Sequence, residues 1–121
     1  PLVDAFDRGA ESVDPWESPD TIVGELEIPD PKGGNAALSA VRETDGGVVA
    51  VDDDDALESA VVAAQRAGLE VGAAGGVALG AVEALADDGA VGEDDHVVAV
   101  NTESGTKTAD ILRSHLMGKG V

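Results

Sequence analysis

The stretch GVVAVDDDDALESAVVAAQRAGLEVGAAGGVALGAVEAL, residues 47–85, decides which fold the sequence predicts. It begins with a short apolar run at 47–51, and such a run without alternation is typical of a buried strand. The acidic run Asp52–Asp55 follows, where its charge complements the dipole at the start of a helix that ends at Gly68. A second helix is predicted over 75–85. Strand and helix patterns therefore alternate with short connections.

The same alternation continues beyond this stretch. LEV (69–71) is a possible short strand, and HVVAV (96–100) is a second strong buried-strand pattern. A last helix is expected after NTESG, with Ile111, Leu112 and Leu116 on one face. We therefore expect an α/β fold in which a parallel sheet carries helices on both faces.

The periodicity also predicts which face each helix buries. Asn35 is expected to cap a helix that stops at Gly46-Gly47, and a short N-terminal helix is closed by Gly9. The expected inward residues are Leu2, Val3 and Phe6; then Ala37, Leu38 and Val41; then Leu57, Ala60, Val61 and Ala64; and finally Val77, Ala78, Ala81, Val82 and Leu85.

Two parts of unequal regularity are visible along the chain. Residues 1–34 form a lead-in with the short helix, the Pro-Trp loop ESVDPWESPD (11–20) and an irregular segment. Residues 35–121 carry the regular α/β pattern. Since the chain begins at Pro1 within an apolar pattern, we expect it to be a piece of a longer protein.

Composition excludes several classes of partner and chemistry. The 121 residues carry a formal net charge of −18, from 25 acidic and 7 basic residues. Such a surface repels nucleic acid and anionic membranes, and it suits a halophilic protein in which salt screens the repulsion. The absence of cysteine excludes disulfides and thiolate catalysis. No apolar stretch approaches a membrane span and no signal peptide is visible, so we expect a cytoplasmic protein.

The most promising candidate site is NTESGTK, residues 101–107. It follows the carboxyl end of a predicted strand, where open α/β sheets bind their ligands. The same residues also suit an N-cap turn, in which Thr102, Ser104 or Thr106 would accept hydrogen bonds from free backbone N–H groups. Spacing alone leaves both interpretations open.

Other polar clusters are weaker candidates, and we predict no metal site. Asp52–Asp55 and Glu93–Asp95 lack the spacing of a calcium loop and are expected to be solvated. His96 and His115 have no nucleophile at a catalytic spacing, so surface or packing roles are expected. The backbone N–H groups of Gly72–Gly76 precede a helix and could face an anion, but tight packing is the simpler interpretation of these small residues.

Three stretches, in this order, resemble the C-terminal part of threonine synthase. They are GGNAALSAVRETDGGVVAVDDDDALESA (33–60), AGLEVGAAGGVALGAVEAL (67–85) and HVVAVNTESGTK (96–107). Threonine synthase is a pyridoxal-phosphate enzyme of the tryptophan-synthase-β fold type. Its most specific motif here, Asn-Thr-Gly-Ser-Gly-Leu-Lys, aligns with residues 101–107. The resemblance implies a parallel sheet within a large domain that binds pyridoxal 5'-phosphate.

The resemblance also implies roles for three residues. The hydroxyl of Thr102 would contact the pyridine nitrogen of the cofactor, while Asn101 and Ser104 would fix the loop. Because a hydroxyl is neutral, it does not hold that nitrogen protonated, which suits elimination and replacement rather than transamination. The complete enzyme would convert the small-molecule substrate O-phosphohomoserine and water to threonine and phosphate.

The catalytic residues are expected elsewhere. The family's Schiff-base lysine and phosphate-binding loop would lie upstream, and Lys107 does not match that lysine; we expect it to make a solvent or subunit contact. This chain alone is therefore expected to be inactive. Its expected partners are the missing N-terminal part of the same enzyme and further copies in a homo-oligomer.

The sequence departs from the family pattern at three places. Glu103 replaces a Gly, Thr106 replaces a Leu, and Ala73–Gly76 replace a more polar stretch. The added carboxylate would either act on the ring nitrogen or point to solvent, and Glu103 would be strained if the Gly served a positive φ. Two alternatives therefore stay open. One is another pyridoxal-phosphate lyase acting on Ser or Thr, and the other is a degenerate, non-catalytic interaction module.

Overall fold

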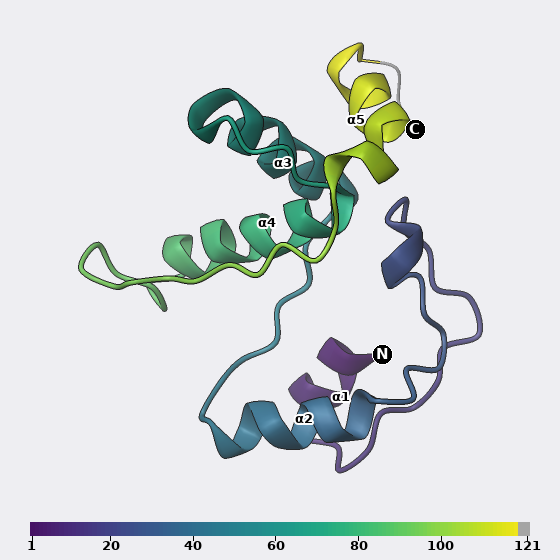
Figure 1. The fold of residues 1–121 in the computed structure, drawn as a ribbon. Helices are drawn as coiled ribbons and strands as arrows, with labels where there is room; N and C mark the ends of the chain where they lie inside the picture. Colours follow the sequence, from purple (N-terminus) through teal and green to yellow (C-terminus); the bar gives the residue numbers. More distant parts are fainter. Residues whose placement is uncertain (119–121) are drawn as a thin grey trace. The chain divides into compact units, whose positions relative to one another are not determined.

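The computed structural model describes residues 1–118, and these residues form two compact units. The first unit is Pro1–Ala50, and the described part of the second is residues 51–118. Helices are the regular elements of both units (Figure 1). Among the described residues, no helix is long and apolar enough to cross a membrane.

The first unit contains α1 (Leu2–Asp7), the short 3-10 helix η1 (Gly24–Leu26) and α2 (Gly34–Glu43). Its centre is small, with Ala5, Val23 and Leu38 almost fully buried. As predicted, α1 is short and is followed by Gly9, whose φ is +65°. That left-handed conformation is easily reached by glycine and reverses the chain after the helix.

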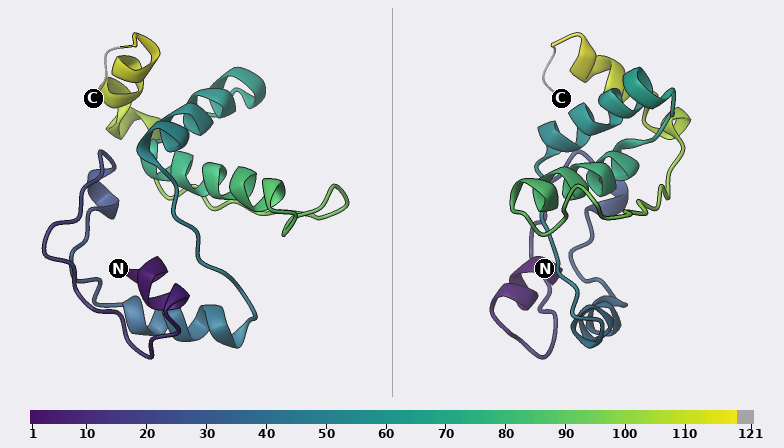
Figure 2. Two further views of the ribbon diagram at one scale, coloured as in Figure 1. Left: turned by 180° about the vertical axis from the view of Figure 1, so that it is seen from behind. Right: turned by 90° about the vertical axis from the view of Figure 1, so that its left-hand side faces the viewer.

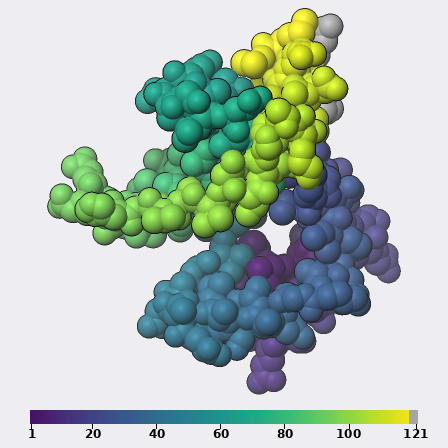
Figure 3. All heavy atoms as spheres, in the orientation of Figure 1, coloured from purple at the N-terminus to yellow at the C-terminus, as the bar shows by residue number. Residues whose placement is uncertain are grey.

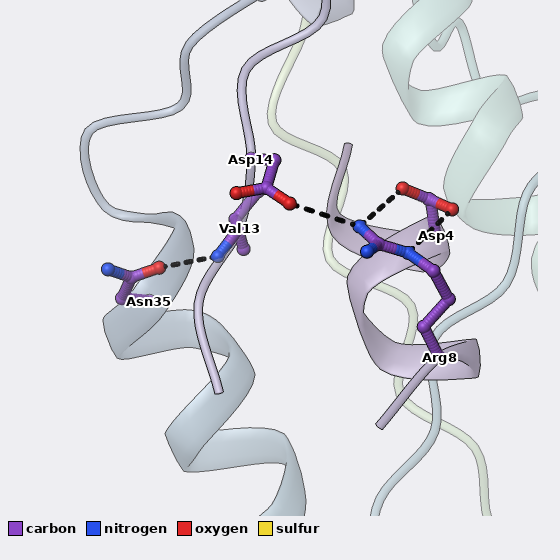
Figure 4. Close-up of polar contacts among 5 residues, drawn as sticks. All are labelled: Asp4, Arg8, Val13, Asp14 and Asn35. Atoms are coloured by element: carbon purple, nitrogen blue, oxygen red, sulfur yellow. Dashed lines mark hydrogen bonds and ion pairs between the residues drawn. The ribbon is translucent and has the colours of Figure 1, made fainter. Parts of the chain in front are cut away.

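Polar contacts tie the first loop of this unit to its helices (Figure 4). The Arg8 guanidinium lies 2.9 Å from Asp4 and 3.4 Å from Asp14, and these partners raise the pKa of Arg8 through hydrogen bonds and charge. The Asn35 Oδ1 accepts a hydrogen bond of 2.8 Å from the N–H of Val13. The prediction that Asn35 caps α2 was therefore wrong, since the N-cap residue is Gly33 and the Asn35 amide binds the loop instead.

Up to residue 118, the second unit contains four helices: α3 (Asp53–Ala67), α4 (Ala73–Asp87), η2 (Gly105–Lys107) and α5 (Ala109–Leu116). Two views show α3 lying against α4, with α5 beside α3 (Figure 2). The predicted end of α3 is confirmed, because Gly68 adopts a left-handed φ of +66°. The acidic run was correctly placed at the start of α3, although Asp52 makes no side-chain capping hydrogen bond.

Small residues on α4 allow the close packing against α3. A β-carbon built at Gly76 would lie 2.0 Å from the carbonyl oxygen of Ala56, and one at Gly80 would lie 2.9 Å from Val51 Cγ1. The fully buried face of α4 is therefore Ala73, Gly75, Gly76 and Gly80. The expected inward residues were wrong, since each is only partly buried: Val77, Ala78, Ala81, Val82 and Leu85.

The expected parallel sheet is contradicted by the structure. The described residues contain no strand, and 47–51 and 96–100 lie outside any regular element. In the second segment Val98 is 86% exposed and Val100 is 68% exposed, so these side chains have no core around them. Apolar β-branched residues favour a strand, but a strand forms only when a partner supplies the hydrogen-bond ladder. The fold of the described chain is helical.

A single bridge is the remnant of the short strand expected at 69–71. Val71 pairs with Ser104 in an isolated antiparallel bridge. The expected boundary between 1–34 and 35–121 concerns domains of a longer protein and stays a prediction. Residues 119–121 of that second range lie outside the described chain.

Candidate functional site

The loop Asn101–Gly105, the centre of NTESGTK, lies against the first turn of α4. The N–H of Gly72 donates a hydrogen bond of 3.1 Å to the Glu103 carbonyl. One residue further on, the N–H of Ala73 donates a bond of 3.0 Å to the hydroxyl of buried Thr108. The segment that leads to this loop lies at the surface of the unit (Figure 3). Backbone contacts thus place an exposed loop on a helix N-terminus.

Glu103 supplies the anion that this helix N-terminus attracts. Its side chain is only 3% exposed, and its Oε2 accepts a hydrogen bond of 3.1 Å from the N–H of Ala74. The other oxygen, Oε1, lies 3.6 Å from the Nζ of Lys107 and makes no hydrogen bond within the described chain. A carboxylate at this place satisfies a free N–H group and interacts favourably with the helix dipole.

Three glycines leave the space that the loop occupies. A β-carbon at Gly72 would lie 2.3 Å from Glu103 Oε2, and one at Gly75 would lie 2.3 Å from Asn101 Oδ1. At Gly105 it would lie 2.6 Å from Glu70 Cγ. Side chains at these positions would displace the loop, so the glycines of GAAGG serve the loop as well as the packing of α4.

Thr102 is exposed, as are Asn101 and Ser104 in the same loop. Its hydroxyl makes no hydrogen bond with any other residue between 1 and 118. The neighbours expected to fix the loop do make local contacts. Asn101 Oδ1 accepts a hydrogen bond of 3.3 Å from the N–H of Glu103, and Ser104 Oγ accepts one of 3.4 Å from Thr106 N. The roles of Asn101, Thr102 and Ser104 toward a cofactor stay predictions.

The structure decides between the expectations for Glu103. Its carboxylate points neither to solvent nor to the exposed side of Thr102, because it is bound at the start of α4. Backbone strain is also absent there, since Asp45 is the one non-glycine residue with positive φ in the described part of the chain. Lys107 is 58% exposed and pairs with Glu103. Apart from the unusual Glu itself, no local pattern indicates that this carboxylate is buried and paired with Lys107.

The other polar candidates lie apart from this loop or at the surface. His96 is exposed, and His115 on α5 lies 3.3 Å from Glu58 on α3, so it joins two helices. Asp54 and Asp55 are exposed in the first turn of α3. Within the described residues, no three His, Asp or Glu side chains are grouped closely enough to hold a metal ion.

Comparison with known proteins gives the chain its family. The family model described as "Pyridoxal-phosphate dependent enzyme" matches residues 1–103, a range that includes Asn101 and Thr102. The chain is also similar to the threonine synthase of Methanosarcina acetivorans, with 32% identity over 84% of the chain and 25% of that protein. The threonine synthase of Methanocaldococcus jannaschii is 28% identical over 91% of the chain and 27% of that protein.

These matches confirm the resemblance to threonine synthase. The chain spans about a quarter of the length of the two curated relatives, so the comparison covers one part of those proteins. The family uses pyridoxal phosphate as its cofactor. The chain belongs to the family of pyridoxal-phosphate dependent enzymes.

Proposed function

We propose that this chain is the C-terminal part of a threonine synthase, which converts O-phosphohomoserine and water to threonine and phosphate. Two relatives with that name cover most of the chain and support the proposal. In the proposal, the hydroxyl of Thr102 contacts the ring nitrogen of pyridoxal phosphate. The observation that carries this role is an exposed hydroxyl, unpaired within residues 1–118, on a loop that other contacts hold in place.

The residues around Thr102 fit such a ring. When bound, pyridoxal phosphate supplies a conjugated ring that accepts electrons from the substrate. A hydroxyl both donates and accepts hydrogen bonds, so Thr102 can meet an unprotonated nitrogen as a donor. The nearest carboxylate along the chain, that of Glu103, is bound to the N–H of Ala74 and buried. The exposed side of the loop therefore presents a neutral partner.

Asn101 and Ser104 hold the backbone on either side of Thr102. The side-chain oxygen of Asn101 accepts a hydrogen bond from the N–H of Glu103. The Ser104 hydroxyl accepts one from the N–H of Thr106 and lies 3.0 Å from the Thr106 hydroxyl. These short-range contacts limit the motion of the residue between them. In the proposal the two side chains orient Thr102 and do not themselves touch the reacting atoms.

The proposal is tested by Thr102→Val in the protein at its native length. We expect phosphate release from O-phosphohomoserine to fall by about 10- to 100-fold, the effect of losing one hydrogen bond of about 1–3 kcal/mol in a desolvated site. Thr102→Ser keeps the hydroxyl and should keep most of the activity. Thr44→Val is the matched control, because it removes the hydroxyl of an exposed threonine in the first unit and leaves the loop around Thr102 unchanged.

Each component of the proposal has a distinct way to fail. Equal activity in Thr102→Val and the wild type would remove the role of Thr102. Turnover of serine or threonine without phosphate release from O-phosphohomoserine would identify another pyridoxal-phosphate lyase. Failure of the native-length protein to bind pyridoxal phosphate would instead support a non-catalytic module.

A further inference from the structure

We propose that Glu103 is a positioning residue for Thr102, and that Gly72 is the position that makes room for it. The buried carboxylate fastens the exposed loop to the first turn of α4 and so presents the Thr102 hydroxyl in one geometry. This inference rests on the proposed function, in which Thr102 contacts the cofactor. It adds a buried residue that touches neither cofactor nor substrate.

Glu103 binds the first turn of α4 through its backbone and its side chain at once. Its carbonyl accepts a 3.1 Å hydrogen bond from the N–H of Gly72, and its Oε2 accepts one of 3.1 Å from the N–H of Ala74. The two anchor points, at the N-cap residue Gly72 and at Ala74 in the first turn, restrain both the position and the rotation of Glu103. Since α4 is 15 residues long and packed on α3, the anchor is itself rigid.

The carboxylate of Glu103 is almost fully shielded from solvent. A buried carboxylate is costly unless hydrogen bonds or an opposite charge compensate it. Here the compensation comes from the Ala74 N–H, the helix dipole and Lys107, whose Nζ lies 3.6 Å from Oε1. Detachment of the loop would break these contacts together.

Gly72 is matched to this carboxylate in space. A β-carbon there would lie 2.3 Å from Oε2, 2.6 Å from Cγ and 2.7 Å from Cδ of Glu103. Any other residue at position 72 would therefore displace the carboxylate from the helix end. Because Gly72 has no side chain, the Glu103 carboxylate can occupy the space next to it.

The anchoring of Glu103 also restrains the adjacent residue, Thr102. Glu103 is buried and the adjacent Thr102 is exposed, so the anchored side chain and the exposed hydroxyl belong to consecutive residues. If the loop detaches, the Thr102 hydroxyl loses its fixed place. The apparent affinity for a ligand is proportional to the fraction of molecules in the binding-competent geometry. Loosening this anchor lowers that fraction, so it should weaken cofactor binding.

The experiment uses the native-length protein and pyridoxal phosphate as the probe. Amide hydrogen exchange of residues 101–105 and the dissociation constant of pyridoxal phosphate are measured for Glu103→Ala, Glu103→Gln, Gly72→Ala and the Gly72→Ala/Glu103→Ala double variant. Glu93→Ala is the control for removal of an exposed glutamate. All measurements are made well below the unfolding temperature of each variant, so that global stability does not enter.

We expect Glu103→Ala to accelerate exchange in the loop and weaken pyridoxal-phosphate binding by about 5- to 10-fold, the loss of one charge-assisted helix-end contact. Glu103→Gln keeps an acceptor for the Ala74 N–H and should recover part of the affinity. Gly72→Ala should reproduce the effect of Glu103→Ala. The double variant should be no worse than Glu103→Ala alone, because the alanine at 72 then meets no carboxylate.

Two outcomes would overturn the inference. One is unchanged affinity and loop exchange in Glu103→Ala while Thr102→Val still impairs catalysis, which would leave the proposed function standing. The other is full additivity of Gly72→Ala and Glu103→Ala, which would show that the two positions act independently. By contrast, failure of the proposed function appears as an unaffected Thr102→Val, whatever Glu103 does.

Discussion

Gly76→Ala is the sharpest test of how the second unit is built. The β-carbon it adds would lie 2.0 Å from the carbonyl oxygen of Ala56 and 2.9 Å from its carbonyl carbon. Both atoms belong to the backbone of α3, so no side-chain rotation relieves the contact. The two helices must separate, or one of them must bend.

The size of the effect follows from two opposing contributions. Replacing glycine within a helix stabilises it by about 1 kcal/mol. Forcing an extra carbon into a packed interface costs about 1–3 kcal/mol, and the upper end applies here because the obstacle is backbone. Separating the helices by about 1 Å also forfeits a quarter to a half of the dispersion energy of the contacts between them. We therefore expect a net loss of about 2 kcal/mol of local stability.

Native-state amide exchange of α3 and α4 in the native-length protein measures this loss. A destabilisation of about 2 kcal/mol corresponds to roughly 30-fold faster exchange of the protected amides. Gly47→Ala is the control, because a β-carbon at Gly47 meets no atom within 4 Å and should leave exchange unchanged. Equal or slower exchange in Gly76→Ala would refute the close packing of α4 on α3 through its glycines.

Three further predictions concern the first unit and the charge of the chain. Leu38→Ala should cost about 2–4 kcal/mol, read as faster amide exchange in α2, because Leu38 is 1% exposed; a loss below about 1 kcal/mol would contradict its core position. Asn35→Ala should increase amide exchange at the N–H of Val13 without shortening α2. NMR chemical shifts that show fraying at the start of α2 in this variant would contradict that expectation. With a net charge of −18, the unfolding midpoint should rise as KCl increases; a midpoint that falls or stays level would count against a salt-adapted surface.

Local patterns predicted where the helices lie better than which residues they bury, since Ala37, Ala64 and Leu116 were expected inside and are exposed. The 3.6-residue period and the glycines after Asp7 and Ala67 placed α1 and α3, because these signals act within a few residues of one another. The buried face of α4 was predicted wrongly for a physical reason. Larger apolar residues were expected inside, but close approach to α3 favours the side without side chains, at Gly76 and Gly80.

Long-range contacts were beyond the reach of local patterns. The run 96–100 has the composition of a strand, yet strand formation depends on a partner that the run itself does not specify. Likewise, nothing near Glu103 in the sequence indicates that its carboxylate binds Ala74, 29 positions earlier. The local pattern did identify NTESGTK as the polar loop before a helix, because Ser104 and Thr106 make short-range capping contacts there.

The most direct test of the central claim is the ¹⁵N chemical shift of ring-labelled pyridoxal phosphate bound to the native-length protein. A hydroxyl partner predicts a neutral, hydrogen-bonded pyridine nitrogen in the wild type. In Thr102→Val the signal should move toward that of a pyridine nitrogen without a donor. A wild-type signal typical of a protonated pyridinium, or one that Thr102→Val leaves unmoved, would contradict the assignment of Thr102.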